Sequence, residues 1–161
     1  MEKYTVLDKM LLFKPLTRGA IEWICMVAVG IAGFVLSWTK IPAVPYLNVF
    51  GVVLFALGFW LHVRCEQVHK QAHVSSEQID GIVTTGLYAW LRHPIYLSLL
   101  MMNLGMGLAF GLVITVVLAL IFSGLWGLTA LAEEKFLRQK FPEAYRRYMQ
   151  DVKWRILPYI F

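Results

Sequence analysis

A stretch of 38 residues, 95–132, contains no charged side chain. About 20 apolar residues in one helix cross the hydrocarbon core of a membrane, so this stretch is too long for one crossing and suits two. Weak helix formers gather near its middle, in the sequence "NLGMGLAFG" at 103–111. The stretch therefore predicts a membrane hairpin with helices at 95–109 and 112–132. Two glycines of this segment, four residues apart, predict close packing of helices: Gly107 and Gly111.

Two further uncharged apolar stretches precede the hairpin, at 23–39 and 41–61. They predict helices at 20–38 and 46–64, so that the chain has about four spans. The composition agrees with this interpretation, because 59% of the 161 residues are hydrophobic and 16% are charged. A soluble domain has about 25% charged residues. The fold class expected is therefore an all-α, polytopic helical membrane protein that ends in a helical hairpin and a polar tail.

A chain of this length predicts a single domain, 1–161. Its first half, 1–80, is expected to hold the first two spans and an amphipathic segment at 4–13 that lies on the membrane surface. Its second half, 81–161, holds the hairpin, the motifs described below and the tail. Reactive side chains are scarce in the spans, so function is expected in the polar segments between and after them.

The basic residues are distributed unevenly, because every Lys and Arg except Lys40 lies on the same side of the predicted spans. The positive-inside rule then places both termini and the middle loop in the cytoplasm, in a prokaryotic inner membrane or the endoplasmic reticulum. The net charge of +5 favours anionic lipid headgroups as partners and not nucleic acid. Cys25 and Cys65 fall in or beside spans, which argues against a disulfide framework.

The segment "LYAWLRHPIYLS" joins charged residues to the start of the third span. Pro94 is expected at the first helical position, with His93 as the cap. The free N–H groups of that turn, the helix dipole and Arg92 would together bind an anionic group such as a carboxylate or phosphate. The same residues also suit an ordinary basic, aromatic membrane boundary. Upstream, the segment offers a turn residue and two aromatic faces: Gly86, Tyr88 and Trp90.

Two adjacent acids, Glu133 and Glu134, follow the last predicted span. Glu134 and Arg138 are one helical turn apart and could simply form an ion pair. Alternatively, the two carboxylates bind an ammonium or sulfonium group, or one of them serves as a base.

A third set of residues would share one helical face if the second span continued inward: His62, Glu66, His69 and His73. Imidazole and carboxylate groups at one-turn spacing can chelate a metal ion. His93 is the only other histidine, so the sequence favours histidines that face headgroups, and no metal site is expected.

The order "LYAWLRHPIYLS" and then, some 35 residues later, "EEKFLRQKFPEAYRRYMQDVKWRILP" resembles the isoprenylcysteine carboxyl methyltransferase family and the related phospholipid methyltransferases. The resemblance covers roughly residues 81–158. The matching positions are Gly86, Tyr88, Arg92, His93, Pro94, Tyr96, Glu133, Glu134, Tyr145, Tyr148, Arg155 and Pro158.

The resemblance implies that S-adenosylmethionine is bound at the cytoplasmic face as methyl donor. Arg92, His93 and the turn that begins at Pro94 would hold its carboxylate, and Glu133 or Glu134 would face its amino group. The same family pattern implies three further cofactor contacts, from Gly86, Tyr88 and Tyr96. It also implies catalytic roles for Arg92 and Glu134, and substrate contacts from Tyr148 and Arg155.

The methyl acceptor implied is lipid-like, and a prenylcysteine-type carboxylate is the first choice. Three alternatives stay open: a phospholipid amine N-methyltransferase, an NADPH-dependent membrane reductase and a non-enzymatic membrane protein. The sequence does not determine the oligomeric state.

Overall fold

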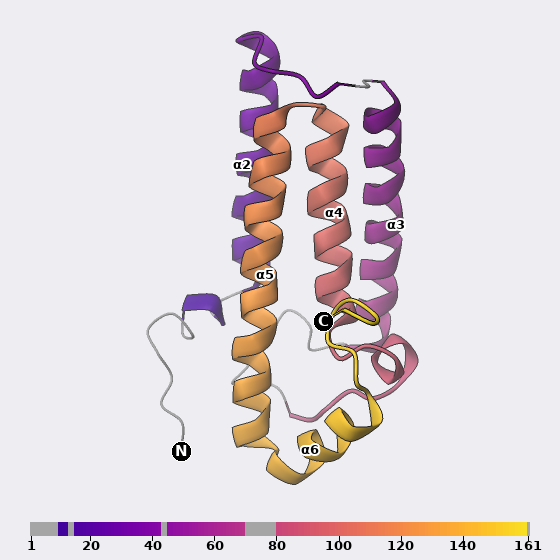
Figure 1. Cartoon of the computed structure of the whole chain (residues 1–161). Coiled ribbons are helices and arrows are strands. Elements are labelled where there is room, and N and C mark those ends of the chain that lie inside the picture. The colour runs from indigo at the N-terminus through magenta and orange to yellow at the C-terminus, as the bar shows by residue number, and fades with distance from the viewer. Residues whose placement is uncertain (1–9, 13–14, 43–44, 70–79, 161) are drawn as a thin grey trace.

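The computed structural model describes residues 10–12, 15–42, 45–69 and 80–160. Four long helices lie side by side, with α4 between α3 and α5 and with α2 beside α5 (Figure 1). The short helix α6 and the chain after it fold back toward the start of α4 (Figure 1). The helical elements are α2 (Pro15–Val35), α3 (Tyr46–Val68), the short 3-10 helix η2 (Gly86–Ala89), α4 (Pro94–Phe110), α5 (Val113–Lys140) and α6 (Pro142–Asp151).

Three of these helices, α2, α3 and α5, are long and apolar enough to cross a membrane, and α4 is a shorter apolar helix of 17 residues. Their outward faces expose large apolar side chains, such as Ile24 on α2, Phe59 on α3 and Ile121 on α5. Apolar surface of this extent is typical of contact with lipid. The prediction of an all-α, polytopic membrane protein is therefore confirmed.

The helix boundaries differ from those predicted by the apolar runs. Helix α2 begins at Pro15, a residue favoured at the first helical position, and ends at Val35. The chain leaves the helix there because Ser37 adopts a left-handed φ of 53°, while the Trp38 N–H donates to the Gly33 carbonyl over 2.9 Å. The predicted span 20–38 was thus placed too late in the sequence. The predicted surface segment 4–13 lies largely outside the described residues.

Helices α3 and α5 both continue beyond their apolar runs, to Val68 and Lys140. Charged residues mark where a helix leaves the apolar layer, but Glu, Lys, Arg and Gln are good helix formers and do not end it. Helix α5 ends at Lys140, and its cap residue Phe141 directly precedes Pro142, which disfavours a helical conformation in the residue ahead of it. The adjacent acids Glu133 and Glu134 therefore lie inside a rigid helix.

The hairpin between α4 and α5 turns at Gly111, which has a φ of 65° and caps α4. A left-handed residue at this position favours glycine, so capping α4 is the role that the structure gives Gly111, and its part in helix packing stays a prediction. Gly107 does pack closely, because a Cβ there would lie 2.9 Å from the Ala119 Cβ on α5. The Thr115 hydroxyl also donates to the Gly107 carbonyl over 2.8 Å, which joins the two helices.

Helices α3 and α4 are in backbone contact at Gly105. A Cβ built on Gly105 would lie 2.5 Å from the Phe55 nitrogen and 2.7 Å from the Gly51 carbonyl oxygen. Neither atom is the end of a flexible side chain, so the two helices can approach this closely only with glycine here.

Replacing Gly105 by alanine is expected to lower the free energy of unfolding by about 1–3 kcal/mol, because the added methyl group forces two backbones apart. Thermal unfolding of the detergent-solubilised protein measures this. The control is Gly124→Ala on α5, where a Cβ meets no atom within 4 Å and where alanine favours the helix. Equal melting temperatures for the two variants would contradict the close packing of α3 on α4.

Candidate active site

A cavity of about 60 Å³ lies where the start of α4, the second half of α5 and α6 meet. The start of α2, the segment 81–83, η2 and His69 at the end of α3 also contribute to its wall. Small-molecule pockets measure roughly 300–1,000 Å³, so this cavity is smaller than a typical ligand pocket. The ionisable and aromatic side chains in its wall are His69, Tyr88, Arg92, His93, Tyr96, Glu133, Tyr145 and Tyr148.

Four tyrosines form an aromatic wall of the cavity: Tyr88, Tyr96, Tyr145 and Tyr148. The hydroxyl groups of the last three have different surroundings. The Tyr96 hydroxyl donates to Glu133 Oε2 over 2.7 Å, and the Tyr148 hydroxyl donates to the Tyr88 carbonyl over 2.7 Å. The Tyr145 hydroxyl is buried and has no hydrogen-bond partner among the described residues. A buried hydroxyl without a partner is costly to leave unsatisfied, which points to a ligand or solvent partner.

Burial raises the pKa of Tyr88, Tyr145 and Tyr148 above the ordinary tyrosine value. These side chains therefore stay neutral at any physiological pH, and each offers one O–H donor and an electron-rich ring face. The tyrosine rings and the Glu133 carboxylate suit a cation, whereas Arg92 in the same wall suits an anion.

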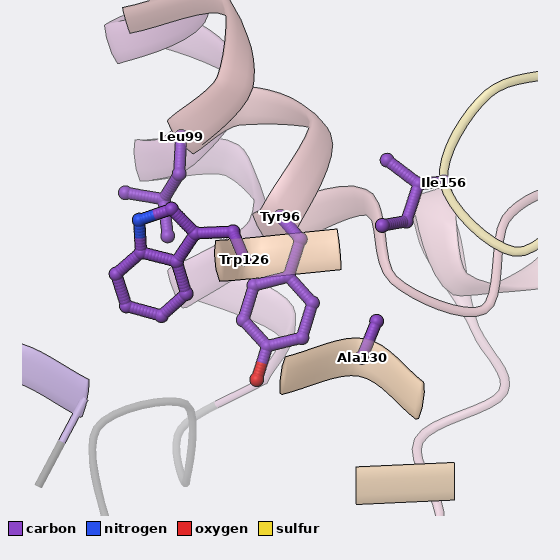
Figure 2. Close-up of a cluster of buried hydrophobic side chains, with 5 residues drawn as sticks. All are labelled: Tyr96, Leu99, Trp126, Ala130 and Ile156. Carbon is purple, nitrogen blue, oxygen red and sulfur yellow. The ribbon is translucent and has the colours of Figure 1, made fainter. Parts of the chain in front are cut away.

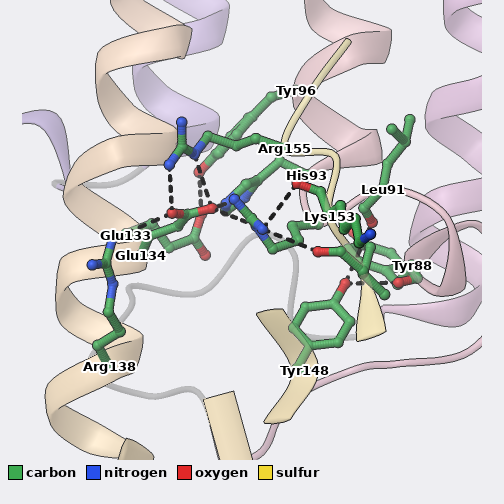
Figure 3. A network of polar contacts seen from close by, with 12 residues as sticks. Tyr88, Leu91, His93, Tyr96, Glu133, Glu134, Arg138, Tyr148, Lys153 and Arg155 are labelled. Carbon is green, nitrogen blue, oxygen red and sulfur yellow. Dashed lines mark hydrogen bonds and ion pairs between the residues drawn. The ribbon is translucent and has the colours of Figure 1, made fainter. Parts of the chain in front are cut away.

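Glu134 lies at the centre of a buried ion cluster. The Arg92 Nε donates to Glu134 Oε1 over 2.8 Å, and Arg155 forms a forked contact, with Nε 3.0 Å from Oε1 and Nη2 3.1 Å from Oε2. Arg138 and His93 approach the same carboxylate at 3.4 Å. Figure 3 shows Arg138 and Arg155 turned toward Glu134 from different parts of the chain. The Glu134 side chain is fully buried, so it functions as the counterion of this cluster.

The two adjacent acids thus point in different directions. Glu133 lines the cavity and Glu134 does not. Successive residues of a helix are about 100° apart around its axis, so only one of the two can face the cavity. His93 lies between them, with Nδ1 3.6 Å from Glu133 and Nε2 3.4 Å from Glu134.

The tail returns to the Arg-His-Pro segment by backbone pairing. The Arg92 N–H donates to the Trp154 carbonyl over 2.9 Å, and the His93 N–H donates to the Arg155 carbonyl over 2.8 Å. Arg92 Nη1 also donates to the carbonyls of Val152 and Lys153. This backbone pairing places the Arg155 side chain beside Glu134. Arg155 and Tyr148, which the sequence associated with the substrate, hold the tail and the Tyr88 segment in position.

The start of α4 follows the sequence prediction. Pro94 is the first helical residue and His93 occupies the cap position, although its side chain makes no capping hydrogen bond. Gly86 has a φ of 61° and opens η2, so the predicted tight turn is confirmed. η2 brings Tyr88 to the cavity wall.

The predicted histidine and carboxylate set is divided by the end of α3. His62 and Glu66 lie in the helix, with Nε2 and Oε1 3.2 Å apart, and His62 Nδ1 contacts the Ser98 hydroxyl over 2.9 Å. His69 is the C-cap residue of α3 and packs against the Tyr88 ring. His73 lies outside the described residues. In the described part of the chain, groups of three or more metal-ligating side chains do not occur.

The fold and this site together define a class: an integral membrane protein with a cavity at one end of a helical bundle, lined by tyrosines and by side chains of both charges. The chain belongs to the phospholipid methyltransferase family, whose family model matches residues 46–144. The resemblance drawn from the sequence motifs is thereby confirmed, and the family indicates a membrane methyltransferase. Helix α2 and the tail with Arg155 lie outside the matched residues.

A curated relative is the cobalt-zinc-cadmium resistance protein CzcN of Cupriavidus metallidurans (strain CH34). It is 32% identical over 109 residues, which amount to 66% of this chain and 46% of the relative. The chain therefore spans about half the length of the relative it matches.

Proposed function

We propose that the protein transfers a methyl group from S-adenosylmethionine to a lipid-like acceptor at the cytoplasmic face of the membrane. The observation that carries this proposal is the cavity in which Glu133, the unsatisfied Tyr145 hydroxyl and His93 converge among tyrosine rings. Membership of the phospholipid methyltransferase family supports the reaction type. The cytoplasmic orientation rests on the one-sided distribution of Lys and Arg along the sequence.

The residues of the cavity fit this cofactor. A sulfonium and an ammonium group suit the tyrosine rings and the Glu133 carboxylate, and the Tyr145 hydroxyl offers a hydrogen bond that nothing in the described chain takes up. Arg92 uses Nε and Nη1 to hold Glu134 and the tail, so Nη2 is the atom proposed to reach the cofactor's carboxylate. When bound, the cofactor supplies the methyl group and leaves as S-adenosylhomocysteine.

An amine is the acceptor that the wall favours. An ammonium group must lose a proton before its nitrogen can accept a methyl group, and Glu133 is the carboxylate available in the cavity wall to take it. The Tyr96 hydroxyl, bonded to Oε2 of Glu133, keeps that carboxylate oriented. The wall holds the reactants together and excludes water, which supplies much of the acceleration in such a transfer.

A carboxylate acceptor of the prenylcysteine type is the second candidate, because Arg92 and His93 also line the cavity and attract an anion. A carboxylate needs no general base, so the two acceptors differ in their dependence on Glu133. Release of S-adenosylhomocysteine with an amine-headgroup lipid and with a prenylated cysteine analogue separates them.

The test of the cofactor is calorimetric titration of S-adenosylhomocysteine into the detergent-purified protein. Tyr145→Phe is expected to weaken binding by roughly 2- to 10-fold, the equivalent of one neutral hydrogen bond of about 0.5–1.5 kcal/mol. Tyr46→Phe is the control, because Tyr46 is exposed at the first turn of α3 and is not part of the cavity wall. It should bind as the wild type does.

Absence of binding by a folded wild-type protein would overturn the proposal. A parallel titration with NADPH then tests the membrane reductase. Binding of neither compound would favour a membrane protein without enzymatic activity.

A further inference from the structure

Helix α2 carries two charged residues one turn apart, Arg18 and Glu22, on the side that faces α5. The Glu22 side chain is only 5% exposed, and it lies within the segment of α2 long and apolar enough to cross a membrane. Ionisable groups at such positions are costly, face the interior of the bundle and commonly mark function. This helix lies outside residues 46–144, the part matched by the family.

The Arg18 guanidinium joins three parts of the chain. Nη1 donates to the Leu11 carbonyl over 2.6 Å, Nη2 donates to the Thr129 hydroxyl over 2.8 Å, and Nε lies 3.5 Å from Glu22 Oε1. The guanidinium carbon also lies 4.0 Å from the centroid of the Trp126 ring. Glu22 completes the arrangement, because its Oε2 accepts a hydrogen bond from Trp126 Nε1 over 2.7 Å.

These contacts lead directly to the cavity. Thr129 is itself in the cavity wall, as is Leu12, the neighbour of Leu11. Trp126 stacks on Tyr96 with ring centroids 5.5 Å apart, and Figure 2 shows the two rings next to each other. Tyr96 in turn donates to Glu133. Three residues of α5 form this link between Arg18 and the cavity, and their spacing of i, i+3 and i+7 places them on one helical face: Trp126, Thr129 and Glu133.

We propose that Arg18 is a positioning residue of the site, with Glu22 as its counterion. Arg18 fixes the chain before α2 and two residues of α5, and through Trp126 and Tyr96 it sets the orientation of Glu133 in the cavity. The inference rests on the proposed function and extends the site to a helix outside the matched family region. An arginine suits this role because its planar fork binds several acceptors at once, which the point charge of lysine does not.

A purely structural role is the competing explanation, since the ion pair also anchors α2 to α5. A pair of variants separates the two. Arg18→Gln leaves the Glu22 carboxylate buried without its counterion, so its melting temperature should fall. In Arg18→Gln with Glu22→Gln the uncompensated charge is gone, and the melting temperature should return toward that of the wild type. If Arg18 positions the site, affinity for S-adenosylhomocysteine stays about 10-fold weaker in this double variant despite the restored stability.

The matched control is Arg64→Gln, because Arg64 is an exposed arginine on α3 whose guanidinium packs over the Trp60 ring, away from the cavity. It should retain wild-type affinity. A stable double variant that binds S-adenosylhomocysteine as tightly as the wild type would overturn the positioning role of Arg18 and leave the proposed function standing. If the wild type binds no S-adenosylhomocysteine, the proposed function itself is overturned. The experiment therefore distinguishes failure of the positioning role from failure of the proposed function.

Discussion

Glu134→Gln is expected to lower the free energy of unfolding by about 3–5 kcal/mol, the typical effect of removing one partner from a buried ion pair. The Glu134 carboxylate is fully buried and lies within 3.4 Å of Arg92, Arg138, Arg155 and His93. A neutral amide leaves the nearly buried Arg92 and the partly buried Arg155 without their counterion. Thermal and denaturant unfolding in detergent measure the loss, and a smaller yield of folded protein is expected with it.

The control for this variant is Glu143→Gln on α6. Glu143 and Arg146 also form an ion pair, at 2.7 Å, but both side chains are more than 60% exposed. Exposed pairs contribute about 0–1 kcal/mol, so Glu143→Gln should unfold nearly as the wild type does. Equal stability of the Glu134 and Glu143 variants would contradict the role of Glu134 as the counterion of the cluster.

Glu133→Gln is expected to leave folding intact and to reduce methyl transfer to an amine acceptor by roughly 10²- to 10⁴-fold, the usual contribution of a general base. Glu133 keeps some solvent exposure at the cavity, and the Tyr96 hydroxyl can still donate to an amide oxygen. The measurement is turnover at saturating S-adenosylmethionine, together with the melting temperature of the same preparation.

Glu66→Gln is the control for this second variant, because Glu66 is a carboxylate near the C-terminal end of α3 that does not line the cavity. It should retain turnover. Undiminished amine methylation by Glu133→Gln would exclude Glu133 as the base. Undiminished transfer to a prenylcysteine analogue, with loss of amine transfer, would show that the site accepts both groups and needs a base for only one.

The sequence predicts that Glu133 and Glu134 belong to a site, but not what each of them contacts. Adjacent carboxylates at the end of an apolar run mark a site, and the motif around them indicates the family. The one-dimensional pattern does not say which acid faces the cavity, because that depends on the rotation of α5 about its axis against α4. The structure directs Glu134 to the arginines and Glu133 to the tyrosines. The base proposed here is therefore Glu133, whereas the sequence left the base open between the two acids and the family resemblance implied a catalytic role for Glu134.

Arg18 is the site residue that the sequence analysis missed, and its partner Thr129 lies 111 positions away in the chain. Arg92 and Glu134 were both predicted, but their contact across 42 positions was not. Nothing in the local sequence of Arg18 distinguishes it from the other basic residues that precede the predicted span at 20–38. Its spacing of four residues to Glu22 on an apolar helix was the available signal, since an acid inside a span needs a partner.

The sequence by itself determined the class of protein, the approximate spans, the hairpin and the start of α4 at Pro94. These features follow from properties that each residue carries locally: apolarity, charge, and the backbone preferences of proline and glycine. The tertiary structure alone decided which acid faces the cavity, how the tail brings Arg155 to Glu134, and that α2 reaches the site through Arg18. These features depend on how helices far apart in the chain rotate and pack against one another, and a linear pattern of residues does not contain that information.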